Sequence, residues 1–384
     1  MSVVGVGYVN SGGSGIRQKL SHGGVPGPIA TENQCAQPED ISPTPRSKEL
    51  RQLFIQVLQE NSPCDAILLS GGLDTSVIAE ACTDQPNILN IKTGITVCCG
   101  ETASDRPFST EIARKLGVQH KLIEFDSPLE LIRDQELLDF SVKTLKTFDP
   151  MELRNSIVIA KSMLLAKELG VKSLAAGDGA DEIFAGYSFM HGMPEEKLLL
   201  YIKHMTETMT FCAKKFGDVL GIRIIQPYLD PRVIKFAKSC ASRGELIQPV
   251  KIPDGDTGNT KEALHGKMVL RLAFPEATSC WRKKDPIEQG SGTTVLPELL
   301  KAEADESFET TQQDILEKYS IKIRDPEHLY YFKAFQRVFG DNLDNGLERN
   351  GSDPCIGCGF QLQDNKAMFC KVCGAWPARE TDTK

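Results

Sequence analysis

The stretch ILLSGGLDTSVIAEAC, residues 67–82, places the narrowest limits on how this chain can fold. Its first apolar residues have the length and composition of a short buried strand. Two glycines follow at once, and small and apolar residues resume with helical spacing from Thr75 to about Cys82. A buried strand that turns through glycine directly into a helix is typical of an open α/β sheet, in which ligands bind beyond the carboxyl ends of the strands.

The same alternation of strand and helix continues to about residue 177. An amphipathic helix over residues 47–60 precedes the first strand, because its apolar residues recur at spacings of three and four. Further elements are expected as strands at 87–97, 120–125 and 171–177, and as helices at 109–117, around 127–138 and at 153–169. This alternation predicts a doubly wound parallel sheet. The remainder to about residue 345 is expected to be mainly helical.

Composition limits the class of protein and its setting. The chain has 384 residues with 40% apolar content, enough for one large or two ordinary domains. A net charge of −8 argues against broad attraction to nucleic acid or to an anionic membrane, and leaves open only a small local basic groove. The sequence has no window suited to a membrane span and no secretory signal. Eight of its 12 cysteines are scattered as reduced thiols are, so a cytoplasmic protein without disulfides is expected.

The turn at SGGLDTS has the chemistry of a phosphate-binding loop. Gly71 and Gly72 would let the backbone take positive φ and approach a ligand closely, and the amides at the start of the helix suit an anion. Hydroxyl donors are supplied by Ser70, Thr75 and Ser76. The lysine of a Walker loop is missing, and Asp74 would repel phosphate unless a cation lay between them, so the turn predicts a metal. The alternative is a tight turn that needs glycine for steric reasons alone.

A second motif brings in a family resemblance. SGGLDTS resembles the PP-motif of ATP pyrophosphatases, which cleave ATP between the α and β phosphates, and LAAGDGADEIFAGYSFMHG, residues 174–192, is similar to the second signature of asparagine synthetases. The segments between and after these motifs match in order over residues 46–345, through LRLAFPEATSCWRKKDPIEQGSG to LYYFKAFQRVFGD. The resemblance implies a PP-loop ATP pyrophosphatase sheet with a helical C-terminal part, and an enzyme that uses ATP.

The resemblance also implies roles for three aspartates. Asp74 and Asp181 match the magnesium ligands of the family, whose carboxylate oxygens suit Mg²⁺. The plainer interpretation of Asp181 is a helix N-cap, and a cap can also be a ligand. Asp178 matches an acidic residue that lies beside the acyl-adenylate and helps to deprotonate the attacking amine. Many members have Glu there, and the plainer interpretation is a loop aspartate in a turn.

The remaining family positions concern the nucleotide. Lys284 matches a lysine that contacts the α-phosphate, with Lys283 as the neighbour that a register error would select; by itself Lys284 reads as a solvated surface lysine. Gly290 and Gly292 fit a second loop closing over the nucleotide. Backbones that line the adenine and ribose pocket of the family correspond to Leu69, Val97 and Gly177. Without the resemblance, Leu69 and Val97 would simply be core strand residues.

The start of the chain differs from that of glutamine-using asparagine synthetases. Those enzymes begin with a catalytic cysteine and a glutaminase domain of about 200 residues, whereas residues 1–45 here are rich in Gly, Ser, Pro and Gln and are expected to form a flexible leader. The amine is therefore expected from free ammonia, a separate glutaminase subunit or another amine-bearing substrate.

The tail adds a motif that the family does not supply. Two CxxC pairs within residues 350–378 predict a tetrahedral zinc ribbon, with a redox disulfide pair as the alternative: Cys355, Cys358, Cys370 and Cys373. So short a segment would depend on Zn²⁺ for its fold and is expected to serve docking or assembly, for example of a homo-oligomer. The aromatic residues Phe360, Phe369 and Trp376 are expected to pack the ribbon rather than stack on bases.

The leading hypothesis is an ATP-dependent ligase that adenylates a carboxylate, aspartate first among candidates, and transfers an amine to give an amide such as asparagine. Its substrates are small molecules, and its cofactors ATP and Mg²⁺. One alternative is a PP-loop enzyme that adenylates a tRNA base, favoured by the ribbon and opposed by the acidic charge. The other is a non-catalytic relative that binds a partner, opposed by intact Asp74, Asp181 and Lys284.

Overall fold

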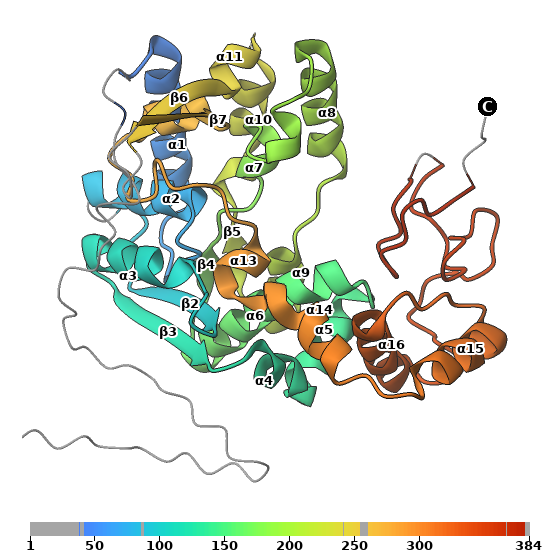
Figure 1. Cartoon of the computed structure of the whole chain (residues 1–384). Helices are drawn as coiled ribbons and strands as arrows, with labels where there is room; N and C mark the ends of the chain where they lie inside the picture. Colours follow the sequence, from blue (N-terminus) through green and yellow to red (C-terminus); the bar gives the residue numbers. More distant parts are fainter. Residues whose placement is uncertain are drawn as a thin grey trace, which may run out of the picture.

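The structure is a computed structural model that describes residue 38 and residues 42–85, 88–240, 242–253, 260–365 and 367–380. Nearly all of the leader expected at residues 1–45 lies outside these residues. Five parallel strands form the central sheet in the order β3-β2-β1-β4-β5 (Figure 1). They are β1 (Ala66–Leu68), β2 (Thr93–Cys99), β3 (Gln119–Phe125), β4 (Ser173–Ala175) and β5 (Arg223–Ile225). The predicted α/β class with a parallel sheet is confirmed, and β5 is a strand that the sequence analysis missed.

The sheet separates two apolar cores because successive strand residues face opposite sides. In β1, Ile67 lies in one core and Ala66 in the other. The first core is covered by α1 (Pro45–Glu60), α2 (Leu73–Asp84), α3 (Asp105–Leu116) and, farther along the chain, α10 (Pro231–Lys238) and α12 (Met268–Ala273). The second is covered by α5 (Gln135–Leu145), α6 (Pro150–Glu168) and α16 (Pro326–Phe339).

The remaining elements surround this three-layer centre. The helices are α4 (Pro128–Arg133), α7 (Ala180–Ile183), α8 (Glu195–Thr208), α9 (Cys212–Leu220), α11 (Arg243–Leu246), α13 (Ile287–Ser291), α14 (Leu296–Ala302) and α15 (Phe308–Tyr319). The region after β5 is mainly helical, as expected, except for the antiparallel pair β6 (Gln248–Pro253) and β7 (Thr260–His265). Among the described residues, none of the helices has the length and hydropathy needed to span a membrane.

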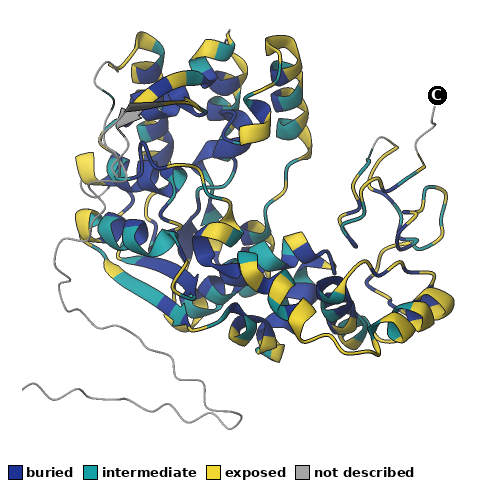
Figure 2. Cartoon of the chain, in the orientation of Figure 1, coloured by how far each residue is buried: buried dark blue, intermediate teal, exposed yellow. Residues whose placement is uncertain are grey.

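The cysteine-bearing tail is built into the second core. Figure 1 shows it beside α15 and α16, and Figure 2 shows buried residues within it. The Phe148 amide donates to the Val372 carbonyl at 2.8 Å, and Lys322 donates in the same way to Gly357 at 2.8 Å. The ring centroid of Phe360 lies 5.9 Å from that of Phe335 in α16. The tail therefore shares its apolar contacts with the main body.

Candidate active site at the carboxyl ends of the strands

Two loops meet where the strand order of the sheet reverses. The SGG turn leaves β1 and the DGADE turn leaves β4, and these strands are neighbours in the sheet. Gly177 lies against the start of α2 so closely that a Cβ atom there would be 2.9 Å from the Asp74 Cβ. Real Cβ contacts are longer, so glycine is needed for the two loops to touch. Ligands of open α/β sheets bind at such a switch point.

The predicted positive φ in the SGG turn is confirmed at Gly71 and is wrong at Gly72. Gly71 has φ 69°, as predicted, but Gly72 has φ −77° and acts as the N-cap of α2. Ser70, Gly72 and Asp74 line a pocket at the end of this turn. Ser76 instead faces the interior, where its hydroxyl accepts the Ser279 amide at 3.1 Å, because it lies on the buried side of α2. Thr75 is also buried, with its hydroxyl 3.4 Å from that of Ser70.

Asp74 and Asp181 converge on a single ammonium group. Lys267 Nζ lies 2.6 Å from Asp74 Oδ1 and 2.8 Å from Asp181 Oδ1. Lys284 Nζ lies 3.0 Å from the other Asp181 oxygen. The plainer interpretation of Asp181 is not supported, since the N-cap of α7 is Gly179 and no side chain caps that helix. Two carboxylates from different strand ends therefore already enclose a cation.

Lys267 is the residue that sequence reasoning missed. It lies directly before α12 with φ 59°, is 3% exposed, and its amide donates to the Phe184 carbonyl at 2.9 Å. The available signal was its place directly before the largely apolar segment MVLRLAF, which predicts burial. A lysine is seldom fully buried unless it is paired with an acidic partner. Gly186 leaves room for this lysine, since a Cβ there would overlap Asp181 Oδ1 and lie against Lys267.

The charges of this cluster act on one another. Burial opposes ionisation of Asp181, but Lys267 and Lys284 outweigh it and hold the pKa of Asp181 below its ordinary value. Burial raises the pKa of Asp74, and the charge of Asp181 adds to this effect while Lys267 opposes it. Partial burial opposes the charge of Lys284, but Asp181 and Asp74 prevail and raise its pKa. Paired carboxylates in such a setting favour a bound cation, and their hard oxygens suit Mg²⁺.

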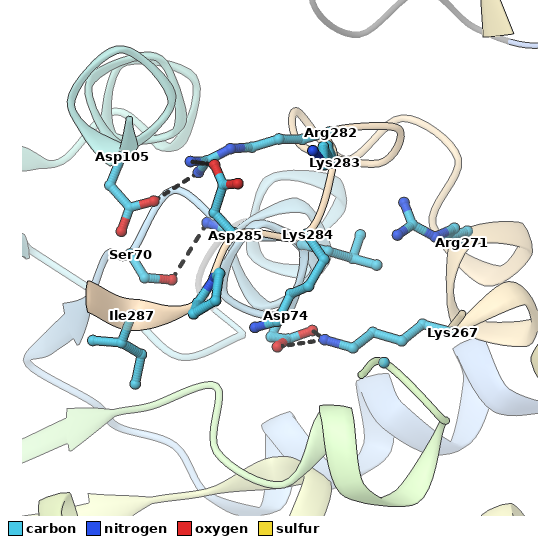
Figure 3. A pocket seen from close by; sticks show the side chains of 14 residues that line it. Ser70, Asp74, Asp105, Lys267, Arg271, Arg282, Lys283, Lys284, Asp285 and Ile287 are labelled. Carbon is cyan, nitrogen blue, oxygen red and sulfur yellow. Dashed lines mark hydrogen bonds and ion pairs between the residues drawn. The ribbon is translucent and has the colours of Figure 1, made fainter. Parts of the chain in front are cut away.

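The pocket beside this cluster carries more cations than carboxylates (Figure 3). Its charged lining residues are Lys267, Arg271, Arg282, Lys283, Lys284, Asp74, Asp105 and Asp285. Lys283 also lines it, but Lys284 makes the ion pair with Asp181. A cation-rich concavity next to a glycine turn suits a polyanion such as a di- or triphosphate.

Asp178 lies apart from the ion pairs. Its Oδ2 accepts a hydrogen bond of 2.8 Å from the Gln226 amide nitrogen. Burial raises the pKa of Asp178 to about 6, although the bond from Gln226 opposes this shift. Gln226 follows β5 and had no recognisable signal, because its role depends on that strand pairing with β4. A carboxyl group with a pKa near 6 is a stronger base than an ordinary aspartate.

The predicted nucleotide-pocket backbones lie in a strand or directly after one, with Val97 in β2, Leu69 after β1 and Gly177 after β4. Leu69 is 1% exposed and Val97 is 6% exposed, so both side chains belong to the core. The Leu69 amide donates to the Ile95 carbonyl at 2.8 Å, and the Thr96 hydroxyl donates to the Leu69 carbonyl at 2.8 Å. Their packing is therefore that of ordinary strand residues, and their contact with a nucleotide stays a prediction.

The four tail cysteines form a second candidate site. All four thiols are buried, and their sulfur atoms lie within 4.8 Å of one another. The Cys355–Cys373 and Cys358–Cys370 sulfur pairs are each 3.7 Å apart. A tetrahedral zinc with Zn–S bonds of about 2.3 Å separates its sulfurs by about 3.8 Å, whereas a disulfide needs about 2 Å. The geometry therefore fits a zinc ion and not the disulfide alternative.

One expectation for the tail is wrong. Phe360 is buried, as predicted, but Phe369 is 45% exposed and Trp376 is 75% exposed. The small ribbon has one buried side, which α16 covers, and these two aromatic rings lie outside it. They do not pack the ribbon.

Most of this chain is similar in sequence to known asparagine synthetases. Residues 58–210 match the family model described as asparagine synthase. Asparagine synthetase B [glutamine-hydrolyzing] of Escherichia coli is 25% identical over 340 residues, 81% of this chain and 56% of that protein. Asparagine synthetase [glutamine-hydrolyzing] 3 of Arabidopsis thaliana is 27% identical over 326 residues, 76% of this chain and 51% of that protein. The chain thus spans about half the length of the curated relatives it matches.

Among solved structures, NMN synthetase from Francisella tularensis aligns over 52% of this chain and 94% of its own, with 15% identity and a TM-score of 0.26.

Proposed function

We propose that this chain, whose residues 58–210 match the asparagine synthase family model, is an ATP-dependent, AMP-forming ligase that makes an amide. A carboxylate oxygen of the substrate attacks the α-phosphorus of ATP, and pyrophosphate leaves. An amine then attacks the acyl carbon of the adenylate, and AMP leaves. Aspartate is the first candidate for the carboxylate, with asparagine as the product. The amine is ammonia, either free or supplied by a separate glutaminase subunit.

The observation that carries this proposal is the cluster of Asp74, Asp181, Lys267 and Lys284 beside the SGG turn. Magnesium, when bound with ATP by Asp74 and Asp181, supplies charge neutralisation for the leaving pyrophosphate. Lys284 is proposed to face the negative charge that develops at the α-phosphate, and its place in the pocket lining beside Asp181 supports this role. Lys267 is the cation that holds the two carboxylates together before the nucleotide binds.

Asp178 is proposed to accept the proton of the attacking amine. Asp178 and Asp181 both lie in the DGADE turn that follows β4. Burial raises the pKa of Asp178 to about 6. The hydrogen bond from Gln226 fixes one of its oxygens and leaves the other for the amine. Leu69, Val97 and Gly177 are proposed to border the adenine and ribose, as in the family.

Pyrophosphate release tests the proposal. Wild-type chain with MgATP is offered a panel of carboxylates with ammonia or glutamine, and each reaction is run with and without bulk tRNA. Release that depends on aspartate and ammonia, together with AMP and asparagine, supports the proposal. Failure of every small carboxylate refutes it.

A second candidate function rests on the exposed rings of the tail. Trp376 and Phe369 present aromatic faces, which in nucleic-acid-binding proteins stack on unpaired bases. A PP-loop enzyme that adenylates a tRNA base would use such a surface. Release of pyrophosphate that requires tRNA and ignores amino acids would select this function in place of the first.

We propose that the four tail cysteines hold one structural zinc per chain. Four thiolates complete the tetrahedron, so no coordination position is left for a substrate. Metal analysis of purified protein should give one zinc per chain, and replacing Cys355 and Cys358 by serine should abolish it.

A further inference from the structure

The segment that carries Lys284 is held by side chains and not by regular secondary structure. Residues 282–286 lie between Trp281 and α13, outside any helix or strand. Within this segment Arg282 is 7% exposed, whereas Lys284, two positions later, reaches Asp181. Since no helix or strand fixes the backbone of this segment, the direction of the Lys284 side chain depends on the contacts that hold its neighbours.

Arg282 is fixed by three oxygen acceptors at the N-terminus of α3 and in its own loop. Its guanidinium donates to Asp105 Oδ1 at 2.7 Å, to the Ser104 hydroxyl at 2.8 Å and to Asp285 Oδ2 at 3.1 Å. The Ser104 hydroxyl in turn donates to the same Asp285 oxygen at 2.9 Å. The guanidinium also lies 4.3 Å from the ring centroid of Phe108. Such a set of charge-assisted bonds defines one orientation of the arginine.

Backbone from two distant parts of the sequence packs against Asp105. A Cβ atom on Gly290 would overlap its carboxylate, and a Cβ on Gly71 would lie 2.8 Å from its carbonyl oxygen. Gly290 therefore packs on Asp105, which lines the pocket, and the closure of its loop over the nucleotide stays a prediction. The side chain of Asp105 is only 13% exposed, and burial raises its pKa to about 6 while Arg282 opposes the shift. At pH 8 this carboxyl group is ionised and pairs with the guanidinium.

A second tie to the SGG turn is made by Ser279, whose carbonyl accepts a hydrogen bond of 3.2 Å from the Arg282 amide. The Ser279 hydroxyl donates to the Gly71 carbonyl at 2.6 Å, and the Ser279 amide donates to Ser76 Oγ at 3.1 Å. The turn after β1, the start of α3 and the Lys284 segment are thus parts of one hydrogen-bonded unit, and Figure 3 shows Arg282 reaching Asp105 at the rim of the pocket.

We propose that Arg282 and Asp105 are positioning residues, which hold the 282–292 segment so that Lys284 faces the phosphates of bound ATP. This inference rests on the proposed function only for the identity of the ligand as ATP, because the hydrogen-bond network exists without substrate. The competing possibility is that Arg282, which lines the pocket, binds a phosphate directly. The two possibilities make opposite predictions for kcat when the charge of Asp105 is removed. If Arg282 binds a phosphate, the change frees Arg282 for that role and kcat does not fall. If Arg282 and Asp105 position Lys284, the change releases the segment and kcat falls.

The experiment is a double-mutant cycle at pH 8 with Asp105→Asn, Arg282→Ala and the combined variant. Each single variant is expected to lower kcat for pyrophosphate release by about 100-fold, since small misplacements of a reacting group have effects of this size. The combined variant is expected to fall little further, because both changes release the same segment. Asp105→Asn with unchanged or raised kcat, or losses that multiply in the combined variant, would overturn the proposal.

Hydrogen–deuterium exchange provides a readout that does not need the ligase reaction. Without substrate, the amides of residues 282–292 should exchange at least about tenfold faster in Asp105→Asn than in wild type. The control is Arg337→Ala, which breaks an ion pair between α16 and α5 and should leave exchange of this segment unchanged. Unchanged exchange in Asp105→Asn would overturn the inference. If wild type forms no pyrophosphate with any carboxylate, the ligase proposal fails and exchange alone decides the positioning role.

Discussion

At the scale of single residues, Lys267 occupies the place between two carboxylates that a divalent cation would take. Its side chain is 4% exposed and contacts both Asp74 and Asp181. Replacing it with Met would leave two buried carboxylates with much less compensation, and we expect a loss of about 3 kcal/mol in the free energy of unfolding. Magnesium should restore more stability to Lys267→Met than to wild type, because only the variant has lost its internal cation. Thermal unfolding with and without MgCl₂ measures this, and equal shifts would argue against a magnesium site here.

Asp74→Asn and Asp181→Asn test the same pair through activity. Each variant keeps the shape of the side chain and removes one charge, so pyrophosphate release should fall to background while the folded structure is retained. Circular dichroism checks the fold. Near-normal turnover in either variant would show that its carboxylate is not needed for the reaction.

Lys284→Ala should lower kcat by about 100-fold or more with a small change in ATP affinity, because a contact that strengthens in the transition state affects turnover more than binding. The comparison variant is Lys283→Ala, whose side chain lines the same pocket without the ion pair to Asp181. A larger loss in Lys283→Ala than in Lys284→Ala would show that Lys283, and not Lys284, has this role.

At the scale of elements, the pairing of β4 with β5 determines the environment of Asp178. The Ala176 amide donates to the Ile225 carbonyl at 2.9 Å, and this register brings Gln226 within 2.8 Å of Asp178. A base acts when deprotonated, so kcat should rise with pH through about 6, the pKa that burial gives Asp178. The bond from Gln226 lowers that pKa, so Gln226→Leu should move the midpoint of the kcat profile to higher pH. A midpoint that does not move in Gln226→Leu would exclude Asp178 as the titrating base.

At the scale of the whole molecule, the ribbon and the main body share one core. Phe360 is fully buried against Phe335, so Phe360→Ala should lower the free energy of unfolding of the entire chain by about 3 kcal/mol. Phe369→Ala is the matched control, because this ring is 45% exposed and its loss should change stability by no more than about 0.5 kcal/mol. Urea unfolding should show one transition in both variants. A ribbon that melts separately, with the main transition unchanged, would show that the two parts are independent.

The sequence by itself determined those features that depend on neighbours along the chain. Apolar periodicity and glycine punctuation predicted the parallel sheet and the turn at Gly71, and two CxxC pairs predicted the sulfur cluster. The acidic residues of the two motifs could be matched from sequence because each lies in a contiguous signature. Local interactions decide such features, so a short window of residues contains the necessary information.

Only the tertiary structure decided which distant residues meet. Lys267 is 193 positions from Asp74 along the chain, and Arg282 is 177 positions from Asp105, so no local pattern pairs them. Phe360 is buried and Trp376 exposed because α16 covers one side of the ribbon and leaves the other to solvent. Gln226 meets Asp178 only because β5 joins the sheet beside β4. Burial and charge pairing arise from packing across the whole chain, and this packing is what turns two motifs into one site.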